Sequence, residues 1–402
     1  MDLSLEALSE FDHEPTDLSV NRENEEETMT VNHLEPIETA ELVENVRAWA
    51  HTANATELAD GRLFLVWSAG QFENSEDMVI AGAVMGADGK WEKTHVVVDR
   101  FELEGETWIP WCPTVLTASD GSLHVFFMGN PRSEYVFVNE PRSIVRASWQ
   151  MGNDAKNQMF HARLRDFQCD QIRMLLPDEP GVNTQGRPLH LQSGGWAVPY
   201  DSCHTTHSHL VVLDEQLEAY EKRGDLFCPP GSLEPSIVQL DDGRILSYLR
   251  FHPRNWNWTK AVAGKEVQGH IWKMMSEDEG RTFCDPVATN LRNPSGAIDI
   301  ALSQSGRLLI TYNDSYALRL PLCVGISDDL GEMFRVRDIE TELGEPVYNW
   351  TFANYEHNCH SYPKLIQTSN GLWHLFYTYR YACIKHVWFD EASVEKGRKV
   401  IG

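Results

Sequence analysis

Residues 236–251 have the sequence SIVQLDDGRILSYLRF, in which an apolar run leads into a polar turn at Gly243 and then into a second run. The Asp242-Gly243 pair supplies the positive φ that a tight turn needs. Apolar residues recur at every second position on both sides of the turn, as they do in strands with one face toward a core. The stretch therefore predicts a β-hairpin.

The same pattern occurs six times along the chain, each time with a glycine at the turn. Successive turn glycines lie between 49 and 73 residues apart, which suits one four-stranded blade with its loops. Six copies predict an all-β, six-bladed β-propeller of four-stranded antiparallel blades, and the long gap before the third copy leaves room for a seventh. Residues 36–48 are predicted as one short helix. The turn glycines, one expected in the inner hairpin of each blade, are Gly61, Gly121, Gly194, Gly243, Gly306 and Gly371.

A second repeat lies between the hairpins. Residues 276–283, SEDEGRTF, have the form S-x-D-x-G-x-T-F, and residues 327–334, SDDLGEMF, are a partial copy that lacks the threonine. In such a turn the Asp accepts from backbone N–H groups, the Gly takes a left-handed conformation and the aromatic ring fills the gap between sheets. We interpret both copies as structural turns.

Charge is unevenly distributed over the 402 residues. The net charge is −26, and residues 1–44 hold fourteen acids against the single base Arg22. We predict an acidic, disordered N-terminal tail at residues 1–40 and a propeller domain at 41–402. Such a charge disfavours nucleic acid and an anionic membrane surface as partners. The first residues lack the basic and apolar regions of a signal peptide, so we expect a cytoplasmic protein, or a secreted one whose leader has been removed.

Neither a metal nor a cofactor is predicted. The eight cysteines are scattered without a CxxC pair, which favours buried free thiols. His204, His207 and His209 form a group that could ligate a metal from a loop, but no Cys or carboxylate partner has a fixed spacing to them. We therefore favour a histidine cluster without a metal.

From about residue 48 to 390 the chain resembles the sialidase (neuraminidase) superfamily, in its divergent Asp-box (BNR-type) propeller branch. The matching stretches are AHTANATELADGRL, LEPSIVQLDDGRILSYLR, NPSGAIDIALSQSGRLLITYN and HSYPKLIQTSNGLWHLFYTYR. The resemblance implies that Glu234 begins the hairpin ending in a carboxylate-binding arginine, Arg250, and that Arg319 is a second such arginine. It also implies that Tyr362 is the nucleophile.

The chemistry of an acidic sugar fits these residue types. A guanidinium holds a planar carboxylate at fixed charge. Sialidases use a tyrosine nucleophile, and a phenol with an ordinary pKa of about 10 needs a neighbouring base such as Glu234 to take its proton. We therefore expect an exo-acting glycosidase whose partner is an acidic glycan or oligosaccharide. The sequence predicts no oligomeric state.

The chain also departs from the family pattern. His51 stands where sialidases have an arginine, so one cation of the carboxylate site is replaced by a titratable imidazole. The acid/base residue of the family would lie on the following loop, where Glu73, Glu76 and Asp77 are the candidates, and Asp77 is our choice. Two further candidates for substrate binding are Arg187 and Trp256, whose indole is suited to stacking on a sugar ring.

Two alternative functions stay open at this point. In a polysaccharide lyase acting beside a uronate, Arg250 would neutralise the carboxylate, His51 would be the base and Tyr362 the acid. In a propeller that only binds a glycan, Glu234 and Tyr362 would have no reason to be paired. We predict that His51, Glu234, Arg250, Arg319 and Tyr362 meet at one end of the central channel.

Overall fold

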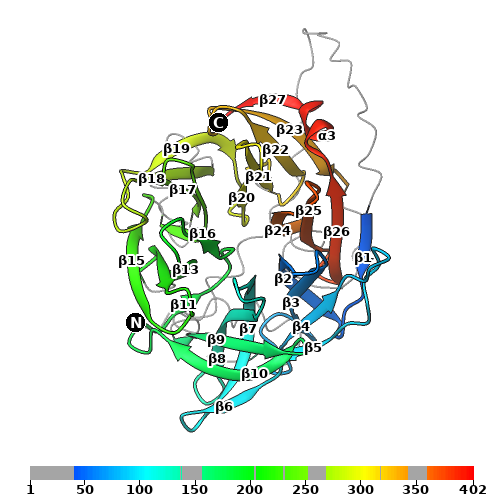
Figure 1. Cartoon of the computed structure of the whole chain (residues 1–402), viewed down its shortest axis with the longest axis vertical. Helices are drawn as coiled ribbons and strands as arrows, with labels where there is room; N and C mark the ends of the chain where they lie inside the picture. Colours follow the sequence, from blue (N-terminus) through cyan, green and yellow to red (C-terminus); the bar gives the residue numbers. More distant parts are fainter. Residues whose placement is uncertain are drawn as a thin grey trace, which may run out of the picture. The chain divides into compact units, whose positions relative to one another are not determined.

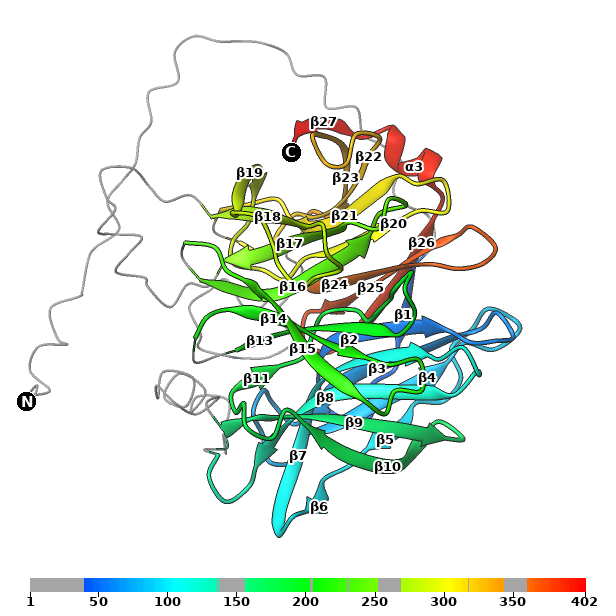
Figure 2. The ribbon, with the colours of Figure 1, turned by 60° about the vertical axis from the view of Figure 1, so that its left-hand side comes forward.

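The computed structural model describes residues 40–135, 137, 156–202, 205–229, 231–251, 269–316, 318–342 and 360–402. These residues belong to one compact unit, Pro36–Gly402. The predictions for the acidic tail, for Trp256 and for His204 lie outside the described residues. Within them, six antiparallel sheets surround a central axis (Figure 1), and Figure 2 shows the same blades from another side. The six-bladed all-β propeller is confirmed, and the six sheets leave no seventh blade in the described part of the chain.

The first three blades in chain order are built from the following strands. Blade 1 contains β2 (Trp49–Glu57), β3 (Leu63–Gly70), β4 (Val79–Val84) and β5 (His95–Val98). Blade 2 contains β6 (Phe101–Leu103), β7 (Glu106–Thr117), β8 (Leu123–Pro131), β9 (Gln158–Arg165) and β10 (Gln168–Leu175). Blade 3 contains β11 (Val182–Asn183), β12 (Leu189–His190), β13 (Trp196–Ser202), β14 (Ser208–Leu213) and β15 (Tyr220–Leu226).

The last three blades include the strands nearest the chain ends. Blade 4 contains β16 (Ser232–Gln239), β17 (Ile245–Phe251), β18 (His270–Ser276) and β19 (Val287–Arg292). Blade 5 contains β20 (Asp299–Leu302), β21 (Leu308–Asn313), β22 (Leu322–Ser327), β23 (Met333–Glu340) and β27 (Arg398–Ile401). Blade 6 contains β24 (His360–Gln367), β25 (Trp373–Tyr379), β26 (Cys383–Phe389) and β1 (Ala40–Val43). A short helix, α3 (Glu391–Glu395), links blade 6 to β27.

The six turn glycines lie where the repeats predicted. Each occurs in the inner hairpin of a different blade, and each has a positive φ, between 82° and 92°. The two SxDxG repeats are turns between the third and fourth strands of blades 4 and 5. Asp278 Oδ1 accepts from Thr282 N (2.8 Å), and Asp329 Oδ1 accepts from Met333 N (2.9 Å). The copy without threonine therefore keeps the backbone cap.

The predicted short helix over residues 36–48 is wrong for its described part. Residues 40–43 form β1, which pairs antiparallel with β26 at the outer edge of blade 6. An unpaired sheet edge offers a row of backbone groups, and this tertiary pairing outweighs the weak local preference for helix. The earliest described strand of the chain thus completes the last blade.

The core is divided among the interfaces between blades. Six apolar clusters each join residues of two adjacent blades, and one example is Tyr248 and Ile271 of blade 4 packed with Ile310 and Phe334 of blade 5. The strand β3 is buried on both faces over its whole length, which explains its nearly continuous apolar sequence.

Candidate active site

The innermost strands share a backbone irregularity at one end of the channel. In β2, β7, β16 and β24 the pairing register shifts at a β-bulge, and the bulged residue lies nine positions before the turn glycine. A bulge redirects a side chain, and a non-glycine residue at positive φ is held there by its surroundings. The four bulged residues, with their φ values, are Thr52 (54°), Cys112 (49°), Glu234 (48°) and Tyr362 (54°).

Glu234, Arg250 and Tyr362 form a closed hydrogen-bonded group. Both carboxylate oxygens of Glu234 lie 2.6 Å from Arg250 Nη1. The Tyr362 hydroxyl accepts from Arg250 Nη1 (3.0 Å) and donates to Glu234 Oε1 (3.1 Å). All three side chains are buried, although Tyr362 comes from blade 6 and the other two from blade 4. The phenol oxygen is thus placed to lose its proton to Glu234.

Arg319 approaches the same phenol ring from blade 5. Its guanidinium carbon is 5.3 Å from the centre of the Tyr362 ring, and that of Arg250 is 5.9 Å away. Arg319 Nη1 also donates to the Tyr381 hydroxyl (3.3 Å). The two guanidinium groups therefore approach the same ring, as the sequence predicted, and guanidinium groups are chemically suited to a carboxylate.

His51 completes the group from blade 1. Its ring packs edge-on against Tyr362 with 4.1 Å between ring centres, and Nδ1 lies 2.9 Å from Thr378 Oγ1. Burial, and then the charges of Arg319 and Arg250, hold the pKa of His51 well below its ordinary value. The imidazole is therefore neutral at physiological pH, and the structure brings the five predicted residues together.

Burial also acts on the nucleophile candidate. It raises the pKa of the Tyr362 hydroxyl above its ordinary value, the charge of Glu234 adds to the rise, and Arg250 and Arg319 oppose it. The phenol consequently stays protonated until a base accepts its proton, and Glu234 is the carboxylate in contact with it.

Comparison with known proteins accounts for the architecture. Residues 61–375 match the model of the BNR repeat-like domain family. The chain belongs to this family. A search of curated proteins finds no significant sequence match. Solved structures with the same fold include the NanB sialidase from Streptococcus pneumoniae, with 12% identity over 89% of this chain and 71% of that one, at a TM-score of 0.63.

This chain covers nearly the whole length of two further solved structures. The intramolecular trans-sialidase from Ruminococcus gnavus shares 11% identity over 87% of this chain and 96% of its own, at a TM-score of 0.63. A protein of unknown function from Dyadobacter fermentans shares 13% identity over 87% of this chain and 97% of its own, also at 0.63. At these identities the likeness is one of fold, and this BNR-repeat protein is a sialidase-like propeller.

The BNR-repeat protein also carries site residues that sequence reasoning missed. Gln185 occupies the position nine residues before Gly194, and its Nε2 donates to Cys112 Sγ (3.2 Å), the sulfur of the bulged residue in blade 2. Trp49 packs against His51 and Trp111, with ring centres 5.3 and 5.6 Å apart, and forms an apolar wall. The constant spacing to the turn glycine was the signal that would have found Cys112 and Gln185.

Two predicted residues are not in contact with this group. Asp77 lies half-exposed on the loop after β3, where its carboxylate accepts from Gln71 N (3.0 Å) and Ser75 Oγ (2.6 Å). Arg187 lies seven residues before Gly194, whereas the bulged residues of the other blades lie nine residues before their turn glycines. Its Nη2 donates to Ile300 O (3.0 Å), and its Nε is 3.8 Å from Asp299. Each side chain is engaged by its own blade or by the channel wall.

The other predicted histidines support strands. His207 Nδ1 pairs with Asp225, and His209 Nδ1 lies 2.8 Å from Gly224 O, so both join β14 to β15. Among the described residues, no group of His, Cys, Asp or Glu could hold a metal ion. The six described cysteines are unpaired, and three of them are buried. No helix in the described part is long and apolar enough to cross a membrane.

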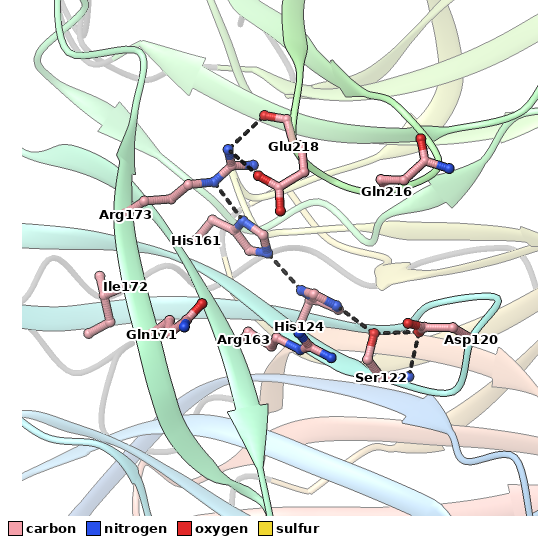
Figure 3. Close-up of a pocket in the computed structure, with 10 residues that line it drawn as sticks. All are labelled: Asp120, Ser122, His124, His161, Arg163, Gln171, Ile172, Arg173, Gln216 and Glu218. Atoms are coloured by element: carbon pink, nitrogen blue, oxygen red, sulfur yellow. Dashed lines mark hydrogen bonds and ion pairs between the residues drawn. The ribbon is translucent and has the colours of Figure 1, made fainter.

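A separate cavity of about 440 Å³ lies between blades 2 and 3 (Figure 3). A chain of hydrogen bonds that all run in one direction lines this cavity. Arg173 Nε donates to His161 Nδ1 (3.1 Å), so the ring proton of His161 is on Nε2, which donates to His124 Nδ1 (2.8 Å). His124 Nε2 must then donate to Ser122 Oγ (2.8 Å), whose hydrogen goes to Asp120. His124 therefore cannot accept a proton from Ser122, and the Ser-His-Asp composition is not a nucleophilic triad.

Proposed function

We propose that this protein is an exo-acting, sialidase-like glycosidase that removes a terminal acidic sugar from a glycan. The observation that carries the proposal is the position of the Tyr362 hydroxyl, which donates to Glu234 Oε1 (3.1 Å) while it accepts from Arg250 Nη1 (3.0 Å). A tyrosine that served packing alone would not need a buried carboxylate and a buried guanidinium on its oxygen, since burying charge is costly.

The proposed reaction has two steps. Tyr362 Oη attacks the anomeric carbon as its proton passes to Glu234, and the bond from that carbon to the leaving oxygen breaks. The leaving oxygen takes a proton from an acid, for which Asp77 on the rim loop stays our candidate. Water then attacks the anomeric carbon of the glycosyl-tyrosine and gives a proton back to the acid that lost one in the first step, the phenol leaves and regains the proton from Glu234, and the sugar is released. Arg250 and Arg319 hold the substrate carboxylate throughout.

The test compares the wild type with Tyr362→Phe and Glu234→Gln on a panel of sialylated and uronate-capped glycans. Release of the terminal acidic sugar is expected from the wild type, with losses of about a hundred- to ten-thousand-fold in each variant. Tyr316→Phe, which changes an exposed tyrosine of blade 5, is the matched control and should keep the wild-type rate. Undiminished release by Tyr362→Phe would rule out the tyrosine mechanism.

One observation favours a second candidate, a uronate lyase. His51 is neutral and packs on Tyr362, so it has the protonation state that a base needs. In elimination, His51 would take the C5 proton, the C4–O bond would break, a C4–C5 double bond would form and Tyr362 would protonate the leaving oxygen. The product absorbs in the near ultraviolet, which no hydrolysis product does. Absorbance without released sugar would therefore assign the lyase. Binding without either product would assign a glycan-binding propeller.

A further inference from the structure

At most interfaces between blades, a side chain at the same position in the repeat contacts the next blade around the channel. The side chain seven residues after a turn glycine contacts the irregular segment of the following blade at five of the six interfaces. The pairs are Ser68 Oγ with Cys112 N (2.9 Å), Asp201 Oδ1 with Glu234 N (3.1 Å), Arg250 Nε with Ser295 Oγ (3.2 Å), Asn313 Nδ2 with His360 O (2.9 Å) and Thr378 Oγ1 with His51 Nδ1 (2.9 Å).

Asp201 is the unexpected member of this series. Ser68 does the same task in blade 1, where its hydroxyl accepts from the bulged Cys112, so a carboxyl group is not required for the hydrogen bond. Asp201 is fully buried, and its Oδ2 has no hydrogen-bond partner within the described residues. Oδ1 also accepts from Asn183 Nδ2 (3.3 Å). Burying a carboxyl beside a second carboxyl is costly, and packing alone does not explain this cost.

The contact with Asp201 stabilises an unusual backbone conformation of Glu234. Its backbone has a φ of 48°, which an L-residue adopts only under constraint, and Asp201 accepts the N–H of that same residue. The bulge directs the Glu234 side chain toward Arg250 and Tyr362. Without an acceptor, the buried N–H would be unsatisfied, and the backbone would relax toward the ordinary β conformation.

We propose that Asp201 is the positioning residue of the Glu234–Tyr362 pair: its carboxyl holds the backbone of Glu234 in the left-handed conformation that places the Glu234 carboxylate against the Tyr362 hydroxyl. The effect on turnover rests on the proposed function, whereas the effect on the backbone does not. Asp201 itself touches no reacting atom.

The charged and titratable groups around Asp201 favour its neutral form. Burial, and then the charge of Glu234, raise the pKa of Asp201 to about 8, while the Glu234 N–H and Arg250 oppose the rise. Cys112 also faces this region, and burial raises the pKa of its thiol, so it adds no charge. A neutral carboxyl is matched in shape and acceptor capacity by the amide of asparagine. Asp201→Asn should therefore keep the positioning contact.

The experiment measures kcat and KM for release of the terminal sugar from the sialylated and uronate-capped glycans named above. It compares the wild type with Asp201→Asn, Asp201→Ser and Asp201→Leu. Asparagine should stay within about threefold of wild type, while leucine, which lacks an acceptor, should lose about a hundredfold in kcat with KM nearly unchanged. Serine, the residue type that does this task in blade 1, should recover part of the loss. The matched control is Ser68→Ala, which removes the equivalent acceptor in blade 1 and should cost less than about fivefold.

Hydrogen exchange supplies a readout that needs no activity. In Asp201→Leu the peptide containing β16 should exchange its amide hydrogens faster than in wild type, while the peptide containing β7 should not change. If Asp201→Leu does not fold, Asp201→Ala removes the same acceptor with a smaller change in shape. Unchanged exchange in β16 overturns the proposal, even if no substrate is ever found. A loss of rate in Asp201→Asn equal to that in Asp201→Leu overturns it as well, because a proton rather than an acceptor would then be needed.

Discussion

The buried carboxyl of Asp201 makes a quantitative prediction about stability and pH. Its pKa is raised to about 8 by burial and by the charge of Glu234, whereas an exposed aspartate titrates near pH 4. Between these two values the folded protein keeps a proton that the unfolded chain has released. The stabilisation from Asp201 is therefore complete below about pH 4 and is lost as the pH rises toward 8. Asp201→Asn removes this dependence, because an amide does not titrate.

The magnitude follows from the size of the shift. Each pH unit between the two pKa values costs about 1.4 kcal/mol of unfolding free energy. From pH 5 to pH 8 the wild type should lose about 3 to 4 kcal/mol that Asp201→Asn does not lose. For a domain of this size, that difference amounts to several degrees in melting temperature. The variant should match the wild type near pH 5 and be clearly more stable at pH 8.

The measurement is the melting temperature of both proteins at pH 5, 6, 7 and 8 and constant ionic strength. Asp241→Asn, which changes an exposed turn residue of blade 4, serves as the control and should give a constant offset. A constant offset for Asp201→Asn too, or a variant less stable than wild type at pH 8, would mean that Asp201 is ionised in the folded protein. The site would then carry one more negative charge than a neutral Asp201 gives it.

Three other predictions use the same proteins and methods. His51→Gln should raise KM by up to about tenfold and leave kcat within a few-fold if Tyr362 is the nucleophile, whereas a loss above about a hundredfold with an absorbing product would indicate His51 as a base. Burial lowers the pKa of His124 to about 4, so His124 should contribute a loss of about 1.4 kcal/mol per pH unit as the pH falls from 6.5 to 4, and the melting curves of His124→Gln should lack this contribution. Deleting residues 1–35 should leave the melting temperature nearly unchanged because β1 remains, whereas deleting 1–44 removes β1 from blade 6 and should lower it by several degrees.

Local patterns in the sequence were sufficient for the architecture. Gly61 and Gly243 each sit in a turn whose type depends on the residues at the turn itself, so the hairpins and the blade count could be predicted. The strand β1 could not, because residues 40–43 are extended only through their pairing with β26, which lies more than 300 residues away. Pairing with a distant edge leaves no local signature.

The candidate site was predictable in part for a similar reason. Glu234 and Tyr362 could be found through a family resemblance, and both are followed by proline at a constant distance from a turn. Cys112-Pro113 shows the same spacing without belonging to any catalytic pattern. Asp201 carries no signal of its own, since a Tyr-Asp-Ser segment in a strand is unremarkable, and its importance depends on a contact with the next blade. Register relative to the turn, more than residue type, predicts which side chains face the site.

The charges in the site restrict the ligand that it suits. Arg250 and Arg319 contribute two positive charges, and Glu234, which is ion-paired with Arg250, removes one. His51 is kept neutral by burial and by both arginines, and Asp201 is neutral below about pH 8. The group therefore has a net charge of about +1, which one carboxylate neutralises. An arginine in place of His51 would raise this charge to +2, so under the proposed function the histidine favours a singly charged ligand over a doubly charged one such as a phosphate ester. Asp201 is already mostly neutral at pH 7, and burial together with the two arginines keeps His51 neutral. Acidification from pH 7 to pH 6 should therefore not strengthen anion binding, and an affinity for an acidic sugar that rises steeply over this range would contradict this charge balance.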